Sequence, residues 1–354
     1  MKQSILFVII FSASVLLVHA SEPTRFRGAM ISPHHFHESD LQVLGESWNA
    51  NVVRWQLNWS FPHGEADKAS VEDYYSWLES ECKLLDTMLP FLRASGVKVC
   101  LDMHTSPGGF NKNDVNRIFE EKEFAEAFLE AWRRLATHYN DENVIWAYDI
   151  LNEPVERDRE NGEYHISWHD LAERTVSAIR EIDAKTPIVY EPASWAGPYC
   201  FQNLVPLNCT NIIYSVHMYL PLEFTHQGIP EAVKEDIPYS YPGLINGDYW
   251  DKEKLRETLE PVLNFQRKYN VPVLVGEFSA IRWAPKNSAY NYLKDVIDIF
   301  EEYGWDWIYH AFREWEGWSL EYPEDKTADA PAVGPTPRQL LLRAYFEKNI
   351  RVID

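Results

Sequence analysis

The sequence predicts one (β/α)8 barrel domain of the α/β class, and three observations lead to this fold. Eight short apolar runs rich in β-branched residues recur along the chain of 354 residues, and stretches of helical periodicity separate them. The runs are apolar nearly throughout, which is typical of parallel strands that helices cover. Eight strand and helix units over about 330 residues fit a barrel with long loops. A doubly wound open sheet is the alternative, and it is disfavoured because no Gly-rich phosphate loop follows any run.

The apolar runs give the predicted strands in chain order. They are Phe26–Ile31, Asn51–Leu57, Val97–His104, Val144–Leu151, Pro187–Glu191, Asn211–Tyr219, Val271–Phe278 and Trp305–Phe312. Helical periodicity marks Glu121–His138, Trp168–Asp183, Lys252–Tyr269, Ser288–Tyr303 and Gln339–Phe346. The stretch Pro221–Trp250 is rich in Pro, Gly, Tyr and acidic residues, and it reads as one long loop after the sixth strand. Long loops at this end of a barrel usually build a binding site.

Residues 1–20 have the pattern of a secretory signal peptide, which leaves residues 21–354 as the barrel domain. Lys2 precedes an apolar run from Ile5 to Val18, and Ala20 precedes a polar segment. The run is shorter than the roughly 20 residues that span a bilayer, so an uncleaved anchor is the disfavoured alternative. We therefore expect a secreted protein, extracellular or periplasmic, that does not bind a membrane once the signal is removed.

Charge and cysteine content narrow the possible partners. The formal charge of −21 disfavours nucleic acid and anionic membranes, because binding to both depends on Lys and Arg. Cys82, Cys100, Cys200 and Cys209 form an even set that could pair in a secreted chain. Cys200 and Cys209 close a short loop and could form a disulfide, although two separate thiols explain them almost as well. No Cys-x-x-Cys spacing points to zinc or redox chemistry, so we expect no cofactor, and a monomer is the default.

Polar residues stand where several predicted strands end, at the rim on which barrels of this type carry out chemistry. They are Arg54, His104, Asn152, Glu153, His217, Tyr219 and Glu277. Strict alternation places Glu277 on the same face as Val271, Val273 and Val275, so that a carboxylate caps an apolar column. A buried carboxylate needs a partner, and Arg54 is the natural counter-ion from across the barrel.

Two carboxyl groups on one rim are what cleavage of a glycosidic bond requires. One protonates the leaving oxygen, and the other attacks the sugar or activates water. Burial or a second carboxylate raises the pKa of a glutamic acid, whereas a glutamate that faces Arg54 and a tyrosine hydroxyl stays ionised. This reasoning makes Glu153 the acid and Glu277 the nucleophile. Taken singly, Glu277 could be a structural ion pair and Glu153 a loop carboxylate.

The strand ends together resemble glycoside hydrolase family 5, the cellulase-containing family of retaining (β/α)8 enzymes. The matching segments are Val52-Val53-Arg54, Leu101-Asp102-Met103-His104 with Pro107-Gly108-Gly109, Asp149-Ile150-Leu151-Asn152-Glu153-Pro154, Val216-His217-Met218-Tyr219 and Val275-Gly276-Glu277-Phe278. Phe224-Thr225-His226-Gln227-Gly228 is similar to a loop of cellulase-like members. The resemblance covers the chain from about Gly28 to Phe346 and is specific because five motifs occur in order.

The resemblance implies a role for each rim residue. Glu153 matches the acid/base of the family and Glu277 its nucleophile, while Asn152 matches the residue that binds the sugar 2-hydroxyl. Arg54 and Tyr219 match residues that hold the nucleophile ionised and oriented. His104 and His217 match residues that line the subsite where the bond is cut; taken alone, each would be read as a core histidine.

The eighth strand departs from the family pattern, in which a Trp usually forms the floor of the cleavage subsite. Here His310 stands where that Trp is expected, and Trp315 could supply the platform from slightly later in the chain. Trp55, Trp59 and Trp195 are further candidates for stacking on sugars, although core packing explains each of them at least as well. The sequence therefore predicts the type of reaction but not which sugar the enzyme prefers.

The sequence thus predicts a secreted retaining β-glycosidase of the endo-β-1,4-glucanase type that acts on a polysaccharide or oligosaccharide. Cleavage of mannan, xyloglucan or 1,3-glucan, or exo-action, is the alternative within catalysis. A non-catalytic carbohydrate-binding barrel is disfavoured, because a binder has no need of two costly buried carboxylates. A metal-dependent hydrolase is suggested by His34-His35-Phe36-His37. It is disfavoured because adjacent histidines on an extended segment point to opposite sides, so we expect no metal.

Overall fold

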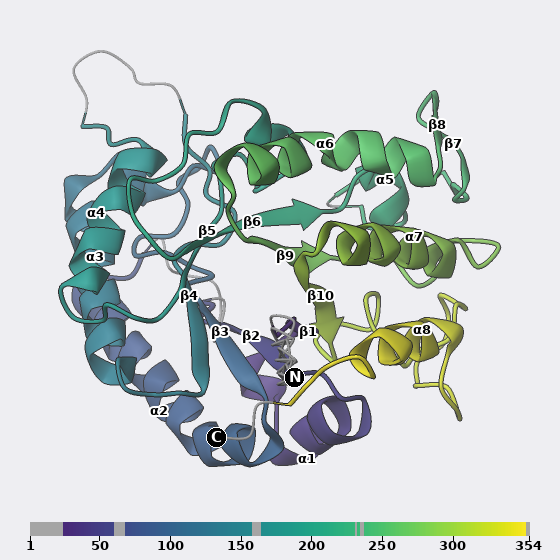
Figure 1. Cartoon of the computed structure of the whole chain (residues 1–354), viewed down its shortest axis with the longest axis horizontal. Helices are drawn as coiled ribbons and strands as arrows, with labels where there is room; N and C mark the ends of the chain where they lie inside the picture. The colour runs from purple at the N-terminus through teal and green to yellow at the C-terminus, as the bar shows by residue number, and fades with distance from the viewer. Residues whose placement is uncertain (1–23, 60–67, 158–163, 231, 234–236, 352–354) are drawn as a thin grey trace, which may run out of the picture.

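The computed structural model describes residues 24–59, 68–157, 164–230, 232–233 and 237–351. Eight parallel strands close into a barrel in the order β1-β10-β9-β6-β5-β4-β3-β2 (Figure 1). They are β1 (Arg27–Ile31), β2 (Val52–Gln56), β3 (Lys98–Asp102), β4 (Ile145–Asp149), β5 (Ile188–Tyr190), β6 (Ile212–Met218), β9 (Val273–Phe278) and β10 (Asp306–Phe312). Each lies within one of the eight predicted segments, and the predicted fold class is confirmed. The signal peptide expected at residues 1–20 lies outside the described residues.

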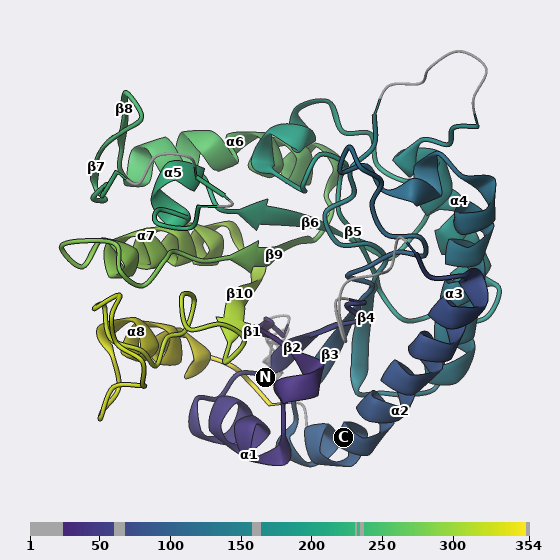
Figure 2. The ribbon, with the colours of Figure 1, turned by 180° about the vertical axis from the view of Figure 1, so that it is seen from behind.

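Helices surround the barrel on its outer side, as Figures 1 and 2 show from opposite directions. They are α1 (Glu38–Leu41), α2 (Val71–Ser95), α3 (Lys122–Tyr139), α4 (Trp168–Arg180), α5 (Leu222–Thr225), α6 (Lys252–Tyr269), α7 (Ser288–Tyr303) and α8 (Pro337–Phe346). Helical periodicity in the sequence does not predict α2, which carries many charged residues and a proline at position 90. Its start is nevertheless encoded locally, because Ser70 and Asp73 form a capping box. Gly96, at φ 68°, ends the helix in the left-handed conformation that glycine accepts readily.

The alternation of side chains along the strands builds two apolar layers. One set of strand residues fills the barrel interior: Met30, Val52, Cys100, Ala147, Val189, Ile213, Leu274, Ile308 and Ala311. The other set faces the helices and joins the larger core between the barrel and its helical coat. Arg54 follows Val52 by two residues along β2, so its side chain also points into the barrel. The interior layer therefore changes from apolar to polar toward the carboxyl ends of the strands.

The segment Pro221–Trp250 is less uniform than the single loop that the sequence predicted. It begins with the short helix α5 and ends with a hairpin of β7 (Gly243–Ile245) and β8 (Asp248–Trp250). The hairpin lies at the outer edge of the molecule beside α6 (Figure 1). Leu222 and His226, near the start of the segment, line the main cavity at the barrel mouth; of the residues that the structure describes in this segment, these two contribute to the site.

Two further expectations concern the cysteines and the membrane. All four cysteines are free thiols in the structure, so Cys200 and Cys209 are not joined. Within the described ranges, no helix combines the length and the apolar character that crossing a bilayer requires.

Candidate active site

Arg54 lies at the centre of the polar end of the barrel and is fully buried. Its Nε donates to Asp149 at 2.9 Å, its Nη1 to Glu277 at 2.6 Å, and its Nη2 to Glu191 at 3.0 Å. Asp102 completes the set, with Oδ1 3.1 Å from Nη2. A single guanidinium therefore serves four carboxyl groups that lie in or directly after four strands, and burial makes each contact strong while leaving little tolerance for its loss.

Glu277 reaches Arg54 because β9 contains a bulge at Gly276. Val216 of β6 pairs with Val275, but the next residue, His217, pairs with Glu277, so β9 has one extra residue at this point. Val275 faces the helices, and without the bulge Glu277 would face them too. The prediction that Glu277 shares a face with Val273 and Val275 is therefore wrong. The bulge turns the carboxylate of Glu277 toward the barrel interior. Gly276 is required there, since a Cβ would lie 2.5 Å from the Ser215 hydroxyl.

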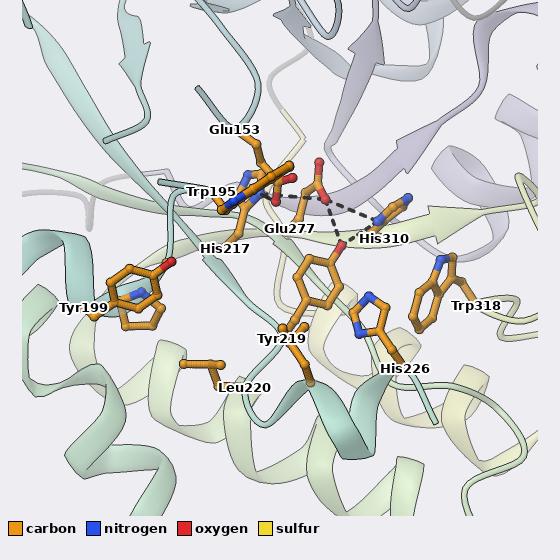
Figure 3. A pocket seen from close by; sticks show the side chains of 13 residues that line it. Glu153, Trp195, Tyr199, His217, Tyr219, Leu220, His226, Glu277, His310 and Trp318 are labelled. Atoms are coloured by element: carbon orange, nitrogen blue, oxygen red, sulfur yellow. Dashed lines mark hydrogen bonds and ion pairs between the residues drawn. The ribbon is translucent and has the colours of Figure 1, made fainter. Parts of the chain in front are cut away.

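The Glu277 carboxylate is held by a ring of donors (Figure 3). Besides the bond from Arg54, its Oε2 accepts a hydrogen bond from the Tyr219 hydroxyl at 2.8 Å and lies 3.3 Å from His310 Nδ1. Burial alone would raise the pKa of Glu277, but His217, His310 and Arg54 outweigh it and hold the pKa well below its usual range. These groups therefore keep Glu277 ionised at neutral pH.

Glu153 follows β4 and has the opposite electrostatic character. Its Oε1 lies 2.8 Å from His217 Nδ1, and about a fifth of its side chain is exposed to the cavity. Burial raises the pKa of Glu153, and although His217 opposes this effect the pKa stays above its usual value. An oxygen of Glu153 lies within 4.8 Å of an oxygen of Glu277. Two carboxyl groups of opposite ionisation tendency therefore face each other across a gap that a sugar carbon and its oxygen would fill.

His217 lies between carboxyl groups on both sides of its ring. Nδ1 faces Glu153, and Nε2 lies 3.0 Å from Glu191. Burial would lower the pKa of His217, but Glu191 and Glu277 raise it well above the ordinary value. Among the described residues, Glu153, His217 and Glu277 form a group with spacing that a metal ion would accept. Both ring nitrogens of His217 already bond carboxyl groups of the protein, so neither is left for a metal and the donor set does not fit one.

A cavity of about 440 Å³ opens above these groups. Trp195 and Tyr199 lie on the Glu153 side of the cavity, and His226 and Trp318 lie beyond Glu277 and His310 on the other side (Figure 3). Trp195 and Tyr199 are each about half exposed, at 47% and 54%. Exposed aromatic faces beside a polar centre are what binding of sugars requires, because sugar rings offer both CH faces and hydroxyl groups.

Comparisons with known proteins agree with this geometry. The sequence model of the family described as Cellulase (glycosyl hydrolase family 5) matches residues 19–315. The chain belongs to glycosyl hydrolase family 5. It is a glycosidase, and the resemblance inferred from the strand-end motifs is confirmed.

The individual relatives and solved structures share 22 to 28% sequence identity with this chain. Endoglucanase C from Acetivibrio thermocellus is 28% identical over 301 residues, which cover 77% of this chain and 84% of that protein. A crystal structure described as a glycoside hydrolase superposes with a TM-score of 0.73 at 22% identity, covering 92% of this chain and all of that one. Cel5A from Thermotoga maritima, solved with mannotriose, gives a TM-score of 0.63 at 22% identity over 84% of this chain and 92% of that one.

The eighth strand shows how this family 5 member departs from the usual pattern. His310 lines the cavity, and its Nδ1 lies 2.5 Å from the Tyr219 hydroxyl. Burial lowers the pKa of His310, but Glu277 and Glu314 outweigh burial and raise it to about 10. An imidazolium of the eighth strand therefore lies beside Glu277.

Trp315 does not line the cavity, and Trp318 takes the place that was expected for it. A tight turn follows β10, in which the amide of Trp318 donates to the carbonyl of Trp315 at 3.2 Å. The turn carries Trp318 back toward the barrel axis, where it packs against Tyr219, His226 and His310. Trp315 lies behind Trp318, with its ring edge-on to Trp318 and to Trp283.

The remaining predicted residues fall into two groups. His104 and Asn152 lie at the rim, where His104 Nδ1 contacts Asp102 at 2.8 Å and Asn152 Oδ1 accepts from Arg54 at 3.0 Å. Trp55 is completely buried and is not a sugar platform, whereas Trp59 is half-buried with its ring stacked on that of Tyr74. In the histidine-rich segment, His34 contacts Glu81 of α2 at 3.0 Å.

Sequence reasoning missed several residues of the site, above all Glu191, Asp149 and His226. Glu191 ends the fifth apolar run and precedes a proline, just as Glu153 does, so the rule applied to the other strands would have found it. Asp149 lies in the Asp-Ile-Leu-Asn-Glu-Pro motif; burial and the neighbouring carboxylates raise its pKa well above the ordinary value despite Arg54. His226 lines the cavity with its pKa lowered to about 4 by burial, and it lies in a motif already noted.

Proposed function

We propose that the chain is a retaining β-glycosidase in which Glu153 is the acid/base and Glu277 the nucleophile. The observation that carries the proposal is the gap of at most 4.8 Å between oxygens of the two side chains. Retaining enzymes place their carboxyl groups about 5 to 5.5 Å apart, whereas inverting enzymes need about 6.5 to 9.5 Å to hold a water between them.

The contacts of the two glutamates suit the two steps of double displacement. In the first step Glu277 attacks the anomeric carbon, the bond from that carbon to the leaving oxygen breaks, and Glu153 gives its proton to that oxygen. In the second step Glu153 takes a proton from water, the water oxygen attacks the anomeric carbon, and the bond to Glu277 breaks. Enzyme and protons return to their starting state.

The surrounding groups support these roles. Tyr219, His310 and Arg54 keep Glu277 ionised and fix its orientation. Because Asn152 Oδ1 accepts from Arg54, the side-chain amide nitrogen is left to donate to a substrate oxygen, for which the 2-hydroxyl is the expected partner. His104 and His217 lie beside the same reaction centre. Hydrogen bonds of this kind strengthen as charge develops in the transition state.

We infer that the substrate is a β-linked glucan cut internally, as by an endo-β-1,4-glucanase. The support is the likeness to endoglucanases and the open cavity with aromatic side chains on both sides of the cleavage point. A second candidate is another β-glycan such as mannan. It is favoured by His310, a charged ring where the family resemblance implies an apolar indole, and by the mannotriose bound to Cel5A.

We also propose that the protein is secreted. The support is the signal-peptide pattern of residues 1–20 alone. Expression of the full gene with N-terminal sequencing of the exported protein tests this: a mature terminus at Ser21 is expected, and retention of Met1 on the exported or cellular protein would contradict it.

A panel of β-1,4-glucan, β-mannan, xyloglucan and β-1,3-glucan tests the function, with product sizing for each polymer. We expect the fastest hydrolysis on β-1,4-glucan with a ladder of oligosaccharides. Fastest hydrolysis of mannan would favour the second candidate, and single-sugar products only would indicate exo-action. No hydrolysis of any β-glycan would contradict the proposal and leave a binding protein.

A further inference from the structure

Glu191 is a fully buried carboxylate directly after β5 that contacts several parts of the site at once. Its Oε1 accepts from Arg54 Nη2 at 3.0 Å and lies 3.0 Å from His217 Nε2. Its Oε2 accepts from the backbone amide of Glu153 at 2.7 Å. Its own carbonyl accepts from the indole of Trp168 at 2.7 Å, which fixes the main chain of Glu191.

Glu191 does not line the cavity, so it cannot touch a substrate held there and must act through its neighbours. One of these is the main chain of Glu153, whose φ of 41° is in the left-handed region that a non-glycine residue seldom adopts. The bond from the Glu153 amide to Glu191 holds this conformation. A second support comes from the next residue, since the carbonyl of Pro154 accepts from the amide of Ser194 at 2.8 Å.

The other neighbour is His217, which is charged only because carboxylates surround it. The groups that face its ring are Glu153 after β4, Glu191 after β5 and Glu277 of β9 at 3.8 Å. Arg54 of β2 reaches it through the shared oxygen of Glu191, and the buried Asp149 of β4 acts at longer range. Of these, only Glu191 bonds Nε2, so the proton on that nitrogen depends on Glu191.

We propose that Glu191 is a positioning residue, which orients the acid/base glutamate through its backbone amide and keeps the adjacent His217 doubly protonated. The proposal rests on the proposed function of Glu153. It explains why the fold buries a third glutamate beside the two that face the cavity: a carboxyl group that must both give and take a proton needs a neighbour of fixed charge and fixed position.

The first test compares leaving groups in Glu191→Gln, which keeps the shape and removes the charge. For phenyl β-cellobioside, which needs a proton on its leaving oxygen, we expect kcat/KM to fall about 100-fold. For 2,4-dinitrophenyl β-cellobioside, which leaves without a proton, we expect a fall of less than about fivefold. Equal losses on both substrates would overturn the proposal, because they would mean a general structural role.

The second readout is the pH profile of kcat/KM, which a structural role would not move. Burial lowers the pKa of His217, and Glu191 is the strongest of the charges that raise it, so His217 loses its charge at lower pH in Glu191→Gln. A neutral His217 no longer lowers the pKa of Glu153. The lost charge of Glu191 itself raises that pKa in the wild type, but both effects of His217 are larger, so the basic limb of the profile is expected to move to higher pH in Glu191→Gln. In Glu191→Asp, which keeps the charge, the basic limb is expected to return toward its wild-type position; an unmoved basic limb in Glu191→Gln would overturn the proposal.

Asp149→Asn is the matched control. Asp149 is equally buried and bonds the same guanidinium, through Nε at 2.9 Å, but neither the His217 ring nor the Glu153 amide bonds it. We expect this variant to lose activity to a similar factor on both aryl substrates. A selective loss on the phenyl substrate in Asp149→Asn as well would assign the effect to Arg54 and overturn the role given to Glu191.

Two measurements keep the test decisive. If Glu191→Gln does not fold, the protonation of the His217 ring can be measured directly by 15N NMR of histidine-labelled wild type, with the His217 signals assigned by comparison with His217→Asn. We expect two protonated ring nitrogens at pH 7. A neutral ring would overturn the proposal. Glu153→Ala is measured in parallel. If it retains activity on phenyl β-cellobioside, the proposed function fails; if it loses that activity while Glu191→Gln behaves like Asp149→Asn, only the present inference fails.

Discussion

Arg54 on β2 and Glu277 on β9 are 223 residues apart in the sequence, and the guanidinium Nη1 lies 2.6 Å from the carboxylate Oε1 inside the barrel. Neither strand neighbours the other in the ring, so closure of the barrel is what brings the two together. The Arg54 side chain is fully buried and that of Glu277 is 5% exposed. The charge that keeps Glu277 ionised is thus part of the interior of the fold, and stability and catalysis depend on the same contact.

We expect Arg54→Met to lower the free energy of unfolding by about 3 to 5 kcal/mol, because it leaves several buried carboxyl groups without their cation. Arg93 provides the control, since it also lies 2.6 Å from a carboxylate, Glu142, but its side chain is 49% exposed. Arg93→Met should cost at most about 1 kcal/mol. Urea unfolding at pH 7 measures both; equal costs for the two variants would mean that the buried network does not stabilise the fold.

The activity is expected to follow a bell-shaped pH profile. Glu277 must be ionised. Burial raises its pKa, but His217, His310 and Arg54 outweigh burial and hold the pKa well below the usual value. We therefore expect kcat/KM to fall only when the pH drops below the pKa of an ordinary glutamate. Glu153 must be protonated, and burial raises its pKa, so kcat/KM falls again as the pH rises through this raised value. With an activated aryl substrate, Glu153→Gln should lose the basic limb and keep the acidic one. Persistence of the basic limb would assign it to another group.

Removal of the acid/base should be chemically rescued. In Glu153→Ala, kcat/KM for phenyl β-cellobioside is expected to fall about 10² to 10⁴-fold, because proton donation to the leaving oxygen is lost. On 2,4-dinitrophenyl β-cellobioside, added azide should raise kcat and give the β-glycosyl azide, since azide needs no general base. Formation of the α-azide, or no response to azide, would argue against a retaining enzyme with Glu153 in this position.

Trp195 and Trp315 form a matched pair for the aromatic part of the site. Trp195 lines the cavity beside Glu153, whereas Trp315 was the sequence candidate and does not line it. We expect Trp195→Ala to raise KM for cello-oligosaccharides about tenfold, a loss of about 1.4 kcal/mol. Trp315→Ala should change KM less than about twofold. The reverse order in steady-state kinetics would place the sugar along the Trp315 side.

The sequence predicted the barrel well because strand and helix periodicities are local signals. Each barrel strand lies within its predicted segment, and Arg54, Glu153, His217, Tyr219 and Glu277 meet as expected, because all barrel strands end on one rim. What it could not give is the direction of a side chain where the backbone departs from ideal geometry. The bulge at Gly276 depends on the pairing of β9 with β6, and the place of Trp318 in the cavity wall depends on its packing against Tyr219 and His226 from a distant segment.

In the proposed mechanism Glu277 forms a covalent bond to the sugar. The most direct test is to incubate the enzyme with 2,4-dinitrophenyl 2-deoxy-2-fluoro-β-cellobioside and map the labelled peptide by mass spectrometry. We expect one fluoroglycosyl group per chain, attached to Glu277, and no labelling of Glu277→Ala. A label on Glu153, Glu191 or another carboxylate, or a product of inverted configuration without any label, would contradict it.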